Sequence, residues 1–246
     1  MPEGRRQVGA LLLATLVGLS WFVLARVSFQ LSRKLVLAGW WHGVPWWHVL
    51  STVRLVLGLF VYIPVAVLVV RRSASSSERP SVVLGLFPPT WAAVACGAVL
   101  VSAGVLAVGP AVVYSRVLSH LGSSPMSVLG ALQPPVVEEL LARGIVWAIL
   151  AAEFPAAFAL VWSSLLFWTW HLEFGLTASL VTGAYGAIVA GGARLVSGTI
   201  WVGLLFHLMA NANAGQELFP TVLVIGGVWL LATRVRSRRG RTSGCS

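Results

Sequence analysis

The chain has 246 residues, of which 58% are hydrophobic and only 10% are charged. A soluble domain has roughly a quarter charged residues, so this chain has too few charges to cover a surface in water. The same figures exclude a disordered chain, and two cysteines exclude a disulfide scaffold. We therefore expect an all-α, polytopic membrane helical bundle. The net charge of +10 then indicates cytoplasmic loops and contact with anionic lipid rather than with nucleic acid.

About eight segments are long and apolar enough for a transmembrane helix, which needs about 20 such residues. The first could instead be a signal peptide with a weak cleavage site after Ala25, but its apolar run is longer than a signal core, which favours an anchor. The fourth begins at a proline pair, a residue type suited to a first helical turn. In chain order the segments are 8–27, 50–70, 91–114, 134–152, 155–172, 176–193, 196–213 and 218–232.

The sequence divides into three regions without a visible repeat. Residues 1–90 hold N-terminal transmembrane helices, a Trp-rich segment at 40–48 and a polar, Ser-rich loop at 71–80. Residues 91–233 form the core of the membrane domain, and residues 234–246 form a basic tail. Tryptophan prefers the membrane interface, so we expect an interfacial anchor at 40–48, with substrate gating as the alternative.

The basic residues predict the orientation of the chain. With eight spans, both termini lie on one side, and eleven Lys or Arg residues of the connections and ends fall there, among them Arg194 between the sixth and seventh spans. Four fall on the other side. We therefore expect both termini in the cytoplasm, with the basic tail as a topology and lipid anchor rather than a nucleic-acid site.

Ionisable residues inside membrane spans are energetically costly, so each is a functional hypothesis. The fourth segment carries Glu138, Glu139 and Arg143. Glu139 and Arg143 are four residues apart and can pair on one helix face. Glu138 points about 100° away and is left without that partner, which suits a general base in a dry site. The alternative is a structural Glu139–Arg143 pair with Glu138 as a bystander.

Two further polar groups occur near the outer ends of the fifth and seventh segments. His171 alone could be a structural or interfacial histidine, and His207 with Asn211 could be an interhelical hydrogen-bond pair. In the predicted topology, however, both groups and Glu138 fall at the same depth of the membrane. Three unrelated packing details are a poor explanation for this convergence.

The motifs E-E-x-x-x-R at 138–143, F-x-x-x-H at 167–171 and H-x-x-x-N at 207–211 follow one another on successive hydrophobic segments. This ordered set resembles the CAAX-protease and bacteriocin-processing (CPBP) family of intramembrane proteases, also called the CAAX prenyl endopeptidase or Abi family. The stretch 197–201 fits as well, whereas Ala142 stands where the family often has an aromatic residue. The resemblance covers about residues 130 to 215.

The resemblance implies peptide-bond hydrolysis within the membrane, on a prenylated C-terminal tail or on other peptides. Carried over, Glu138 would activate water with help from His171, and His207 with Asn211 would stabilise the oxyanion. Arg143 would order Glu138 and Glu139. The residues themselves agree, since hydrolysis needs a base, a positioned water and donors aimed at the developing negative charge.

Metal dependence is the open chemical question. Glu138, His171 and His207 could hold Zn²⁺ with one position open, and the family has been described both as metalloproteases and as metal-independent glutamate proteases. The sequence has no HExxH zinc signature, and Asn211 is a poor zinc ligand but a good oxyanion donor. We expect a glutamic mechanism without a cofactor, with zinc as the alternative.

Two non-protease functions compete with this interpretation. Some proteins with this pattern are associated with bacteriocin immunity, so a binding or scaffold protein is one alternative. A proton-coupled transporter is another, although the repeat symmetry and paired broken helices of many transporters are not visible. The preference for Arg over Lys and the abundant Ala, Val and Gly indicate a GC-rich coding sequence, and this in turn indicates a bacterial source. A peptide precursor or membrane-protein fragment at the plasma membrane is then the expected substrate.

Overall fold

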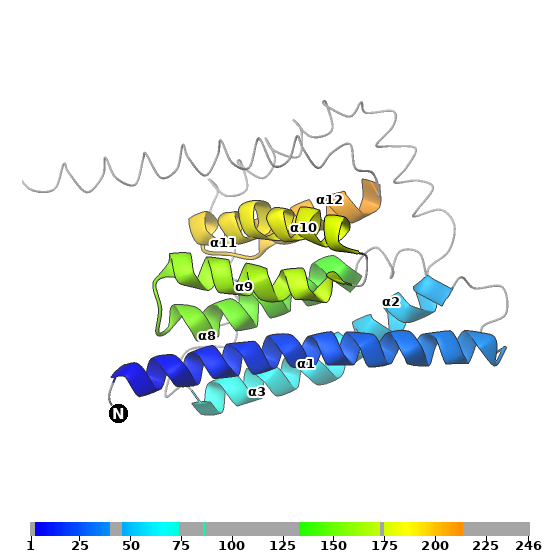
Figure 1. Ribbon diagram of the computed structural model, residues 1–246, viewed down its shortest axis with the longest axis horizontal. Helices are drawn as coiled ribbons and strands as arrows, with labels where there is room; N and C mark the ends of the chain where they lie inside the picture. Colours follow the sequence, from blue (N-terminus) through cyan, green and yellow to red (C-terminus); the bar gives the residue numbers. More distant parts are fainter. Residues whose placement is uncertain (1–2, 40–45, 74–85, 87–132, 173–174, 214–246) are drawn as a thin grey trace, which may run out of the picture.

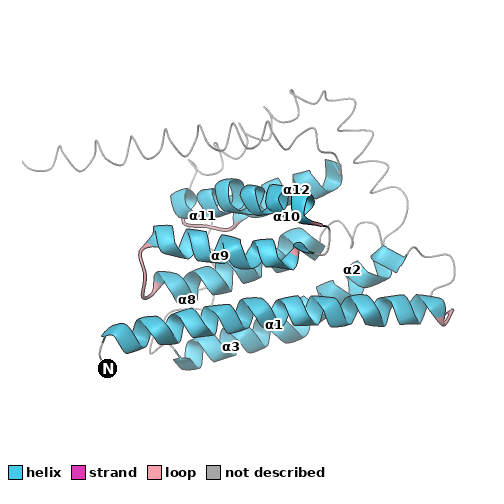
Figure 2. Cartoon of the chain, viewed as in Figure 1, coloured by secondary structure: helices cyan, strands magenta, loops and turns pink. Residues whose placement is uncertain are grey.

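The computed structural model describes residues 3–39, 46–73, 86, 133–172 and 175–213. Within these ranges every regular element is a helix, which confirms the all-α prediction (Figure 2). In chain order the elements are α1 (Glu3–Leu37), α2 (Trp46–Leu57), η1 (Gly58–Tyr62), α3 (Ile63–Ser73), η2 (Pro134–Glu138), η3 (Leu140–Val146), α8 (Trp147–Ala151), α9 (Ala156–Trp170), α10 (Leu176–Tyr185), η5 (Gly186–Gly191), α11 (Gly192–Ser197) and α12 (Trp201–Asn213).

The helices stack in layers, with α1 and α3 on one side, α8 and α9 in the middle, and α10, α11 and α12 on the other side (Figure 1). The elements named η are π-helical turns, which join the α-helical pieces into longer rods. The middle layer contacts both outer layers, α1 through α8 and α9, and α10 through α9. The core of the described bundle therefore lies around α8, α9 and the π-helical turns that precede α8.

Two described helices are long and apolar enough to cross a membrane, namely Glu3–Leu37 and Val49–Val70. Val49–Val70 coincides with the predicted span 50–70. The predicted bounds of the first span, 8–27, are wrong, because α1 is helical from Glu3 to Leu37 and so takes in Arg33 and Lys34, two of the four basic residues expected outside the spans on the other side. The fourth to seventh predicted spans also coincide with helical segments, but α9, for example, has only 15 residues. The third and eighth predicted spans, residues 91–114 and 218–232, lie outside the described residues. The count of eight spans therefore stays a prediction.

The predicted boundary between the sixth and seventh spans is wrong. We expected it beside Arg194, but α11 continues to Ser197, and the chain turns at Gly198, whose φ of 69° is left-handed. Glycine is the residue that adopts this conformation most readily. Arg194 therefore lies inside α11, where it is buried and donates a hydrogen bond to the carbonyl of Gly198. Arg194 is therefore not one of the loop residues whose positive charge predicts the orientation of the chain.

The N-terminal helix α1 is a packed part of the bundle. The indole Nε1 of Trp170 donates to the carbonyl of Gly18 at 2.9 Å, and a Cβ added at Gly18 would lie 2.8 Å from Leu166. The side chain of Trp21 is buried in the same core. Cleavage after Ala25 would remove this packing, which favours the anchor over the signal peptide.

Candidate active site

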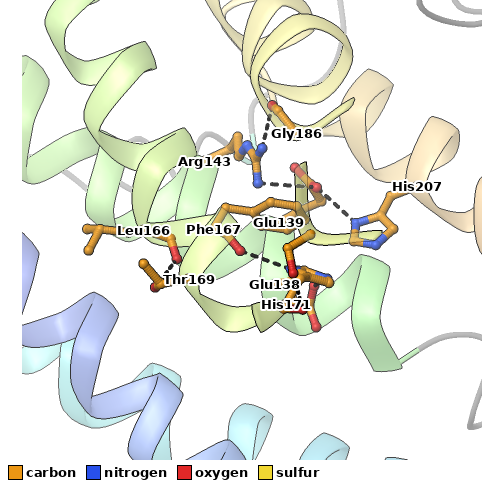
Figure 3. A network of polar contacts seen from close by, with 10 residues as sticks. Glu138, Glu139, Arg143, Leu166, Phe167, Thr169, His171, Gly186 and His207 are labelled. Carbon is orange, nitrogen blue, oxygen red and sulfur yellow. Dashed lines mark hydrogen bonds and ion pairs between the residues drawn. The ribbon is translucent and has the colours of Figure 1, made fainter. Parts of the chain in front are cut away.

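Five of the six predicted site residues meet in one place (Figure 3). Three come from the π-helical stretch before α8, one from the end of α9 and one from α12. The observed contacts join two carboxylates, two imidazoles and one guanidinium; the residues are Glu138, Glu139, Arg143, His171 and His207.

The helix that carries both glutamates has π-helical turns where we expected a regular α-helix. Glu138 ends η2, and Arg143 lies in η3. The backbone N–H of Glu139, just after η2, bonds back to the carbonyls of both Pro135 and Val136, which are an α-type and a 3₁₀-type hydrogen bond, so the regular hydrogen-bond pattern changes at the two glutamates. Such turns are rare and occur frequently at functional sites, because the extra residue redirects the side chains.

Glu139 anchors the buried half of the site. Its Oε1 lies 3.0 Å from His207 Nδ1 and 3.6 Å from Arg143 Nη1, and the side chains of Glu139 and Arg143 are both 0% exposed. The predicted pairing of Glu139 with Arg143 is thus confirmed. The guanidinium of Arg143 also donates to the carbonyl of Gly186. A buried charge needs such partners, because an unpaired one would be strongly disfavoured.

Glu138 and His171 form a looser and more open pair. Glu138 Oε2 lies 3.5 Å from His171 Nε2, and the two side chains are 10% and 11% exposed. This separation is longer than a good hydrogen bond. His171 Nδ1 lies 2.9 Å from the carbonyl of Phe167, which fixes the orientation of the ring. Glu138 is therefore the more accessible and less constrained of the two glutamates.

The contacts of the two imidazoles assign their protons. A carbonyl oxygen only accepts, so His171 carries hydrogen on Nδ1, and its Nε2 is the nitrogen that faces Glu138. In the same way, His207 uses Nδ1–H to donate to the Glu139 carboxylate. Any donation by His207 to a substrate oxygen must then come from a protonated Nε2. That state is an imidazolium, which the Glu139 carboxylate would balance.

Several buried polar atoms of the site make no hydrogen bond to the described residues. They are Glu138 Oε2, Glu139 Oε2, and Nε and Nη1 of Arg143. Buried polar groups are normally hydrogen-bonded, and exceptions cluster where water, an ion or a substrate is bound. The arrangement is therefore suited to take up a polar reactant beside Glu138.

Asn211 lies in α12, four residues after His207. Its side chain lies outside what the structure describes, so its role as an oxyanion donor stays a prediction.

Phe167 has a larger place in the site than the sequence indicated. Its ring lies 4.2 Å from the guanidinium carbon of Arg143 and 4.6 Å from the ring of His171, and it meets the ring of His207 edge-on at 5.8 Å. The Phe167 ring therefore packs against all three of these side chains. The F-x-x-x-H spacing marked this residue, but only as part of a motif.

Within the described residues, no three His, Cys, Asp or Glu side chains are grouped so that they could hold a metal ion. The site instead forms two separate Glu–His pairs, Glu138 with His171 and Glu139 with His207. The contacts at the two Nδ1 atoms are of the kind that also orient metal-bound histidines. However, as the structure describes them, Glu138, His171 and His207 do not form the three-ligand group that zinc needs.

Fold and site together define an all-helical membrane protein with a glutamate–histidine centre inside its bundle. Residues 120–213 match the model of a family described as Type II CAAX prenyl endopeptidase Rce1-like. This match confirms the family resemblance seen in the sequence and supports a CAAX protease-like membrane enzyme. It contains all six predicted site residues but covers less than half of the chain, and residues 1–119 and 214–246 lie outside it. No curated protein and no solved structure matches the chain.

Proposed function

We propose that the protein is an intramembrane endopeptidase that hydrolyses a peptide bond with water activated by Glu138 and His171. The observation that carries this proposal is the unequal placement of the two adjacent glutamates. Glu139 is fully buried and held by a histidine and an arginine, whereas Glu138 faces His171 Nε2 across 3.5 Å on the more open side. Glu138 is suited to act as the base, because a base must reach water. Glu139 is suited to act as a structural anchor, because its partners hold it in place.

In the first step, Glu138 removes a proton from a water molecule held beside His171 Nε2. The water oxygen forms a bond to the carbonyl carbon of the substrate, and the carbonyl becomes an oxyanion. A positioned general base of this kind contributes about 10²–10⁴-fold in rate. In the second step the carbon–nitrogen bond breaks, and the leaving amine takes the proton from Glu138. Each turnover thus consumes one water and returns Glu138 to its ionised form.

The oxyanion would be stabilised by His207 and Asn211. His207 would donate from Nε2 as an imidazolium, since its Nδ1–H is held by Glu139 at 3.0 Å. Donors fixed in advance toward a developing charge are among the largest contributions to catalysis. In this account Glu139 and Arg143 do not touch the reacting atoms. They hold the imidazolium in place and balance its charge.

The proposed reaction uses no cofactor. The two Glu–His pairs supply a base and an electrophile without a metal, and Asn211 is a better hydrogen-bond donor than zinc ligand. Zinc held by Glu138, His171 and His207 is the alternative, and it would act as a Lewis acid on the same carbonyl. Activity after metal chelation separates these mechanisms.

We propose a peptide precursor or membrane-protein fragment as the substrate and the bilayer as the other partner. The family name describes a prenylated CAAX tail, but the composition indicates a bacterial chain, for which such tails are not expected. Nucleic acid is not an expected partner. The expected location is the bacterial plasma membrane, with both termini in the cytoplasm and the site toward the outer leaflet.

The test compares peptide ends in membranes from source cells that carry the native protein or Glu138→Ala at matched expression. Glu153→Ala is the matched control. Glu153 comes just after the end of α8, at the opposite end of this helical stretch from Glu138. We expect specific new ends with the native protein and the control but not with Glu138→Ala. Identical ends in all three samples would contradict the proposal and favour the immunity or scaffold function.

A further inference from the structure

A glycine of η5 lies against the guanidinium that orders the site. Gly186 accepts a hydrogen bond from Arg143 through its carbonyl oxygen (Figure 3). It comes from the sixth predicted span, which carries none of the predicted site residues. The sequence marked this segment only as rich in small residues.

The backbone does not require glycine at this position. Gly186 has φ −56° and ψ −41°, which are ordinary right-handed helical values open to any residue. Glycine inside a helix is in fact less stable than alanine, because it loses more conformational freedom on folding. The reason for a glycine here must therefore lie in the space around it.

That space is filled by the site itself. A Cβ placed on Gly186 would lie 2.6 Å from Arg143 Nη2 and 2.6 Å from the Phe167 ring. Both distances are far below a normal carbon contact. The end of an arginine can usually move aside, but this one is fully buried between Glu139 and the Phe167 ring. A methyl group at this position would displace Nη2 of Arg143 and, with it, the guanidinium whose Nη1 contacts Glu139.

We infer that Gly186 is a positioning residue of the active site: its carbonyl holds Arg143, and its missing side chain leaves room for the guanidinium. The effect reaches the reaction through Arg143, then Glu139, then His207, whose Nδ1 lies 3.0 Å from Glu139. The kinetic part of this inference rests on the proposed protease function. The contact between Gly186 and Arg143 can be tested without activity.

The test is a double-mutant cycle of Gly186→Ala with Arg143→Lys. Lysine lacks the second guanidinium nitrogen that meets the added methyl group, and Arg143→Lys also removes the guanidinium that lies 4.2 Å from the centre of the Phe167 ring. We expect Gly186→Ala to lower kcat by roughly tenfold or more in the native background, with KM little changed. In the Arg143→Lys background it should change kcat by less than about threefold, as residues that act through one contact are non-additive.

Gly183→Ala is the matched control. It lies three residues earlier in α10, and its added Cβ would meet the Trp168 side chain at 2.9 Å, so it crowds the same helix away from Arg143. We expect it to leave kcat within about threefold of the native value. An equal loss of kcat from both alanine variants, or an equal effect of Gly186→Ala in both backgrounds, would overturn the inference.

The four proteins of the cycle are also compared by thermal unfolding in detergent. Gly186→Ala should lower the melting temperature in the native background but not in the Arg143→Lys background, and this holds even if the single variant accumulates poorly. An equal drop in melting temperature in both backgrounds would show that Gly186 is needed for helix packing that does not involve Arg143, which would overturn the inference. If the native protein has no protease activity, the proposed function fails, while the melting temperatures still decide on the contact.

Discussion

Glu138 and Glu139 are neighbours in the sequence, yet they lie in two different environments. Glu139 is 0% exposed and contacts both His207 and Arg143, whereas the Glu138 side chain is 10% exposed and contacts His171 at 3.5 Å. One carboxylate is fully buried and held by two partners, and the other keeps about a tenth of its side chain exposed and has one longer contact. The comparison shows how one helical turn can separate a structural role from a chemical one.

The two carboxylates diverge at a point where the chain makes π-helical turns. Glu138 closes η2 and Arg143 lies in η3, with Glu139 between them. Consecutive side chains on a helix point in different directions, so Glu138 meets His171 while Glu139 meets His207 and Arg143. The two glutamates should therefore respond differently to the same substitution.

Replacement of Glu138 should give the largest change in activity. Glu138→Gln keeps the size of the side chain but removes the base, so we expect the rate of substrate cleavage to fall by about 10²–10⁴-fold. The melting temperature in detergent should change little, because the contact of Glu138 with His171 is long, at 3.5 Å. Cleavage is followed by mass spectrometry of the new peptide ends in isolated membranes, with Glu153→Gln as control. Retained activity in Glu138→Gln would make Glu138 the bystander.

Replacement of Glu139 should instead damage the fold. Glu139→Gln removes the negative charge that balances Arg143 and His207, and loss of one partner from a buried ion pair costs about 3–5 kcal/mol. We expect a clear drop in melting temperature, together with loss of cleavage. Thermal unfolding of Glu138→Gln and Glu139→Gln side by side is the measurement. Equal stability of the two variants would remove the distinction between the two glutamates.

The Glu138–His171 pair can be tested without removing the carboxylate. In His171→Asn the side-chain amide can still donate to the carbonyl of Phe167, but nothing replaces Nε2. We expect cleavage to fall by about 10²-fold while stability stays close to native. A rate near that of the native protein would show that His171 only orients the local backbone.

Metal chelation should have the smallest effect. If the site works through two Glu–His pairs, a strong zinc chelator should leave the cleavage rate unchanged after prolonged incubation. The rate is measured with and without chelator, and again after added Zn²⁺. Loss of activity on chelation with recovery on zinc would instead support a metal held by Glu138, His171 and His207.

Much of the site could be predicted because polar residues inside apolar segments are rare. Charge inside the membrane is costly, so Glu138, Arg143 and His207 stood out without any structure. The four-residue spacing of Glu139 and Arg143 also predicted their pairing correctly. The same reasoning placed the helical segment at 50–70 close to where the structure has it, because long apolar runs are a strong signal, but it missed that α1 continues to Leu37.

The parts that were missed depend on packing rather than composition. Arg194 was placed in the connection between the sixth and seventh spans, but it lies inside α11 and is buried. The π-helical turns leave no mark in a hydrophobic pattern. Gly186 was one glycine among several, and only its distance to Arg143 and Phe167 distinguishes it.

The most direct test of the central claim is the transfer of an oxygen atom from water to the cleaved peptide. Membranes with the native protein, Glu138→Gln or Glu153→Gln are incubated in H₂¹⁸O, and the new carboxyl termini are analysed by mass spectrometry. Hydrolysis with Glu138 as the base predicts new ¹⁸O-labelled ends with the native protein and Glu153→Gln, and none above background with Glu138→Gln. The same labelled ends in all three membranes would contradict this role of Glu138.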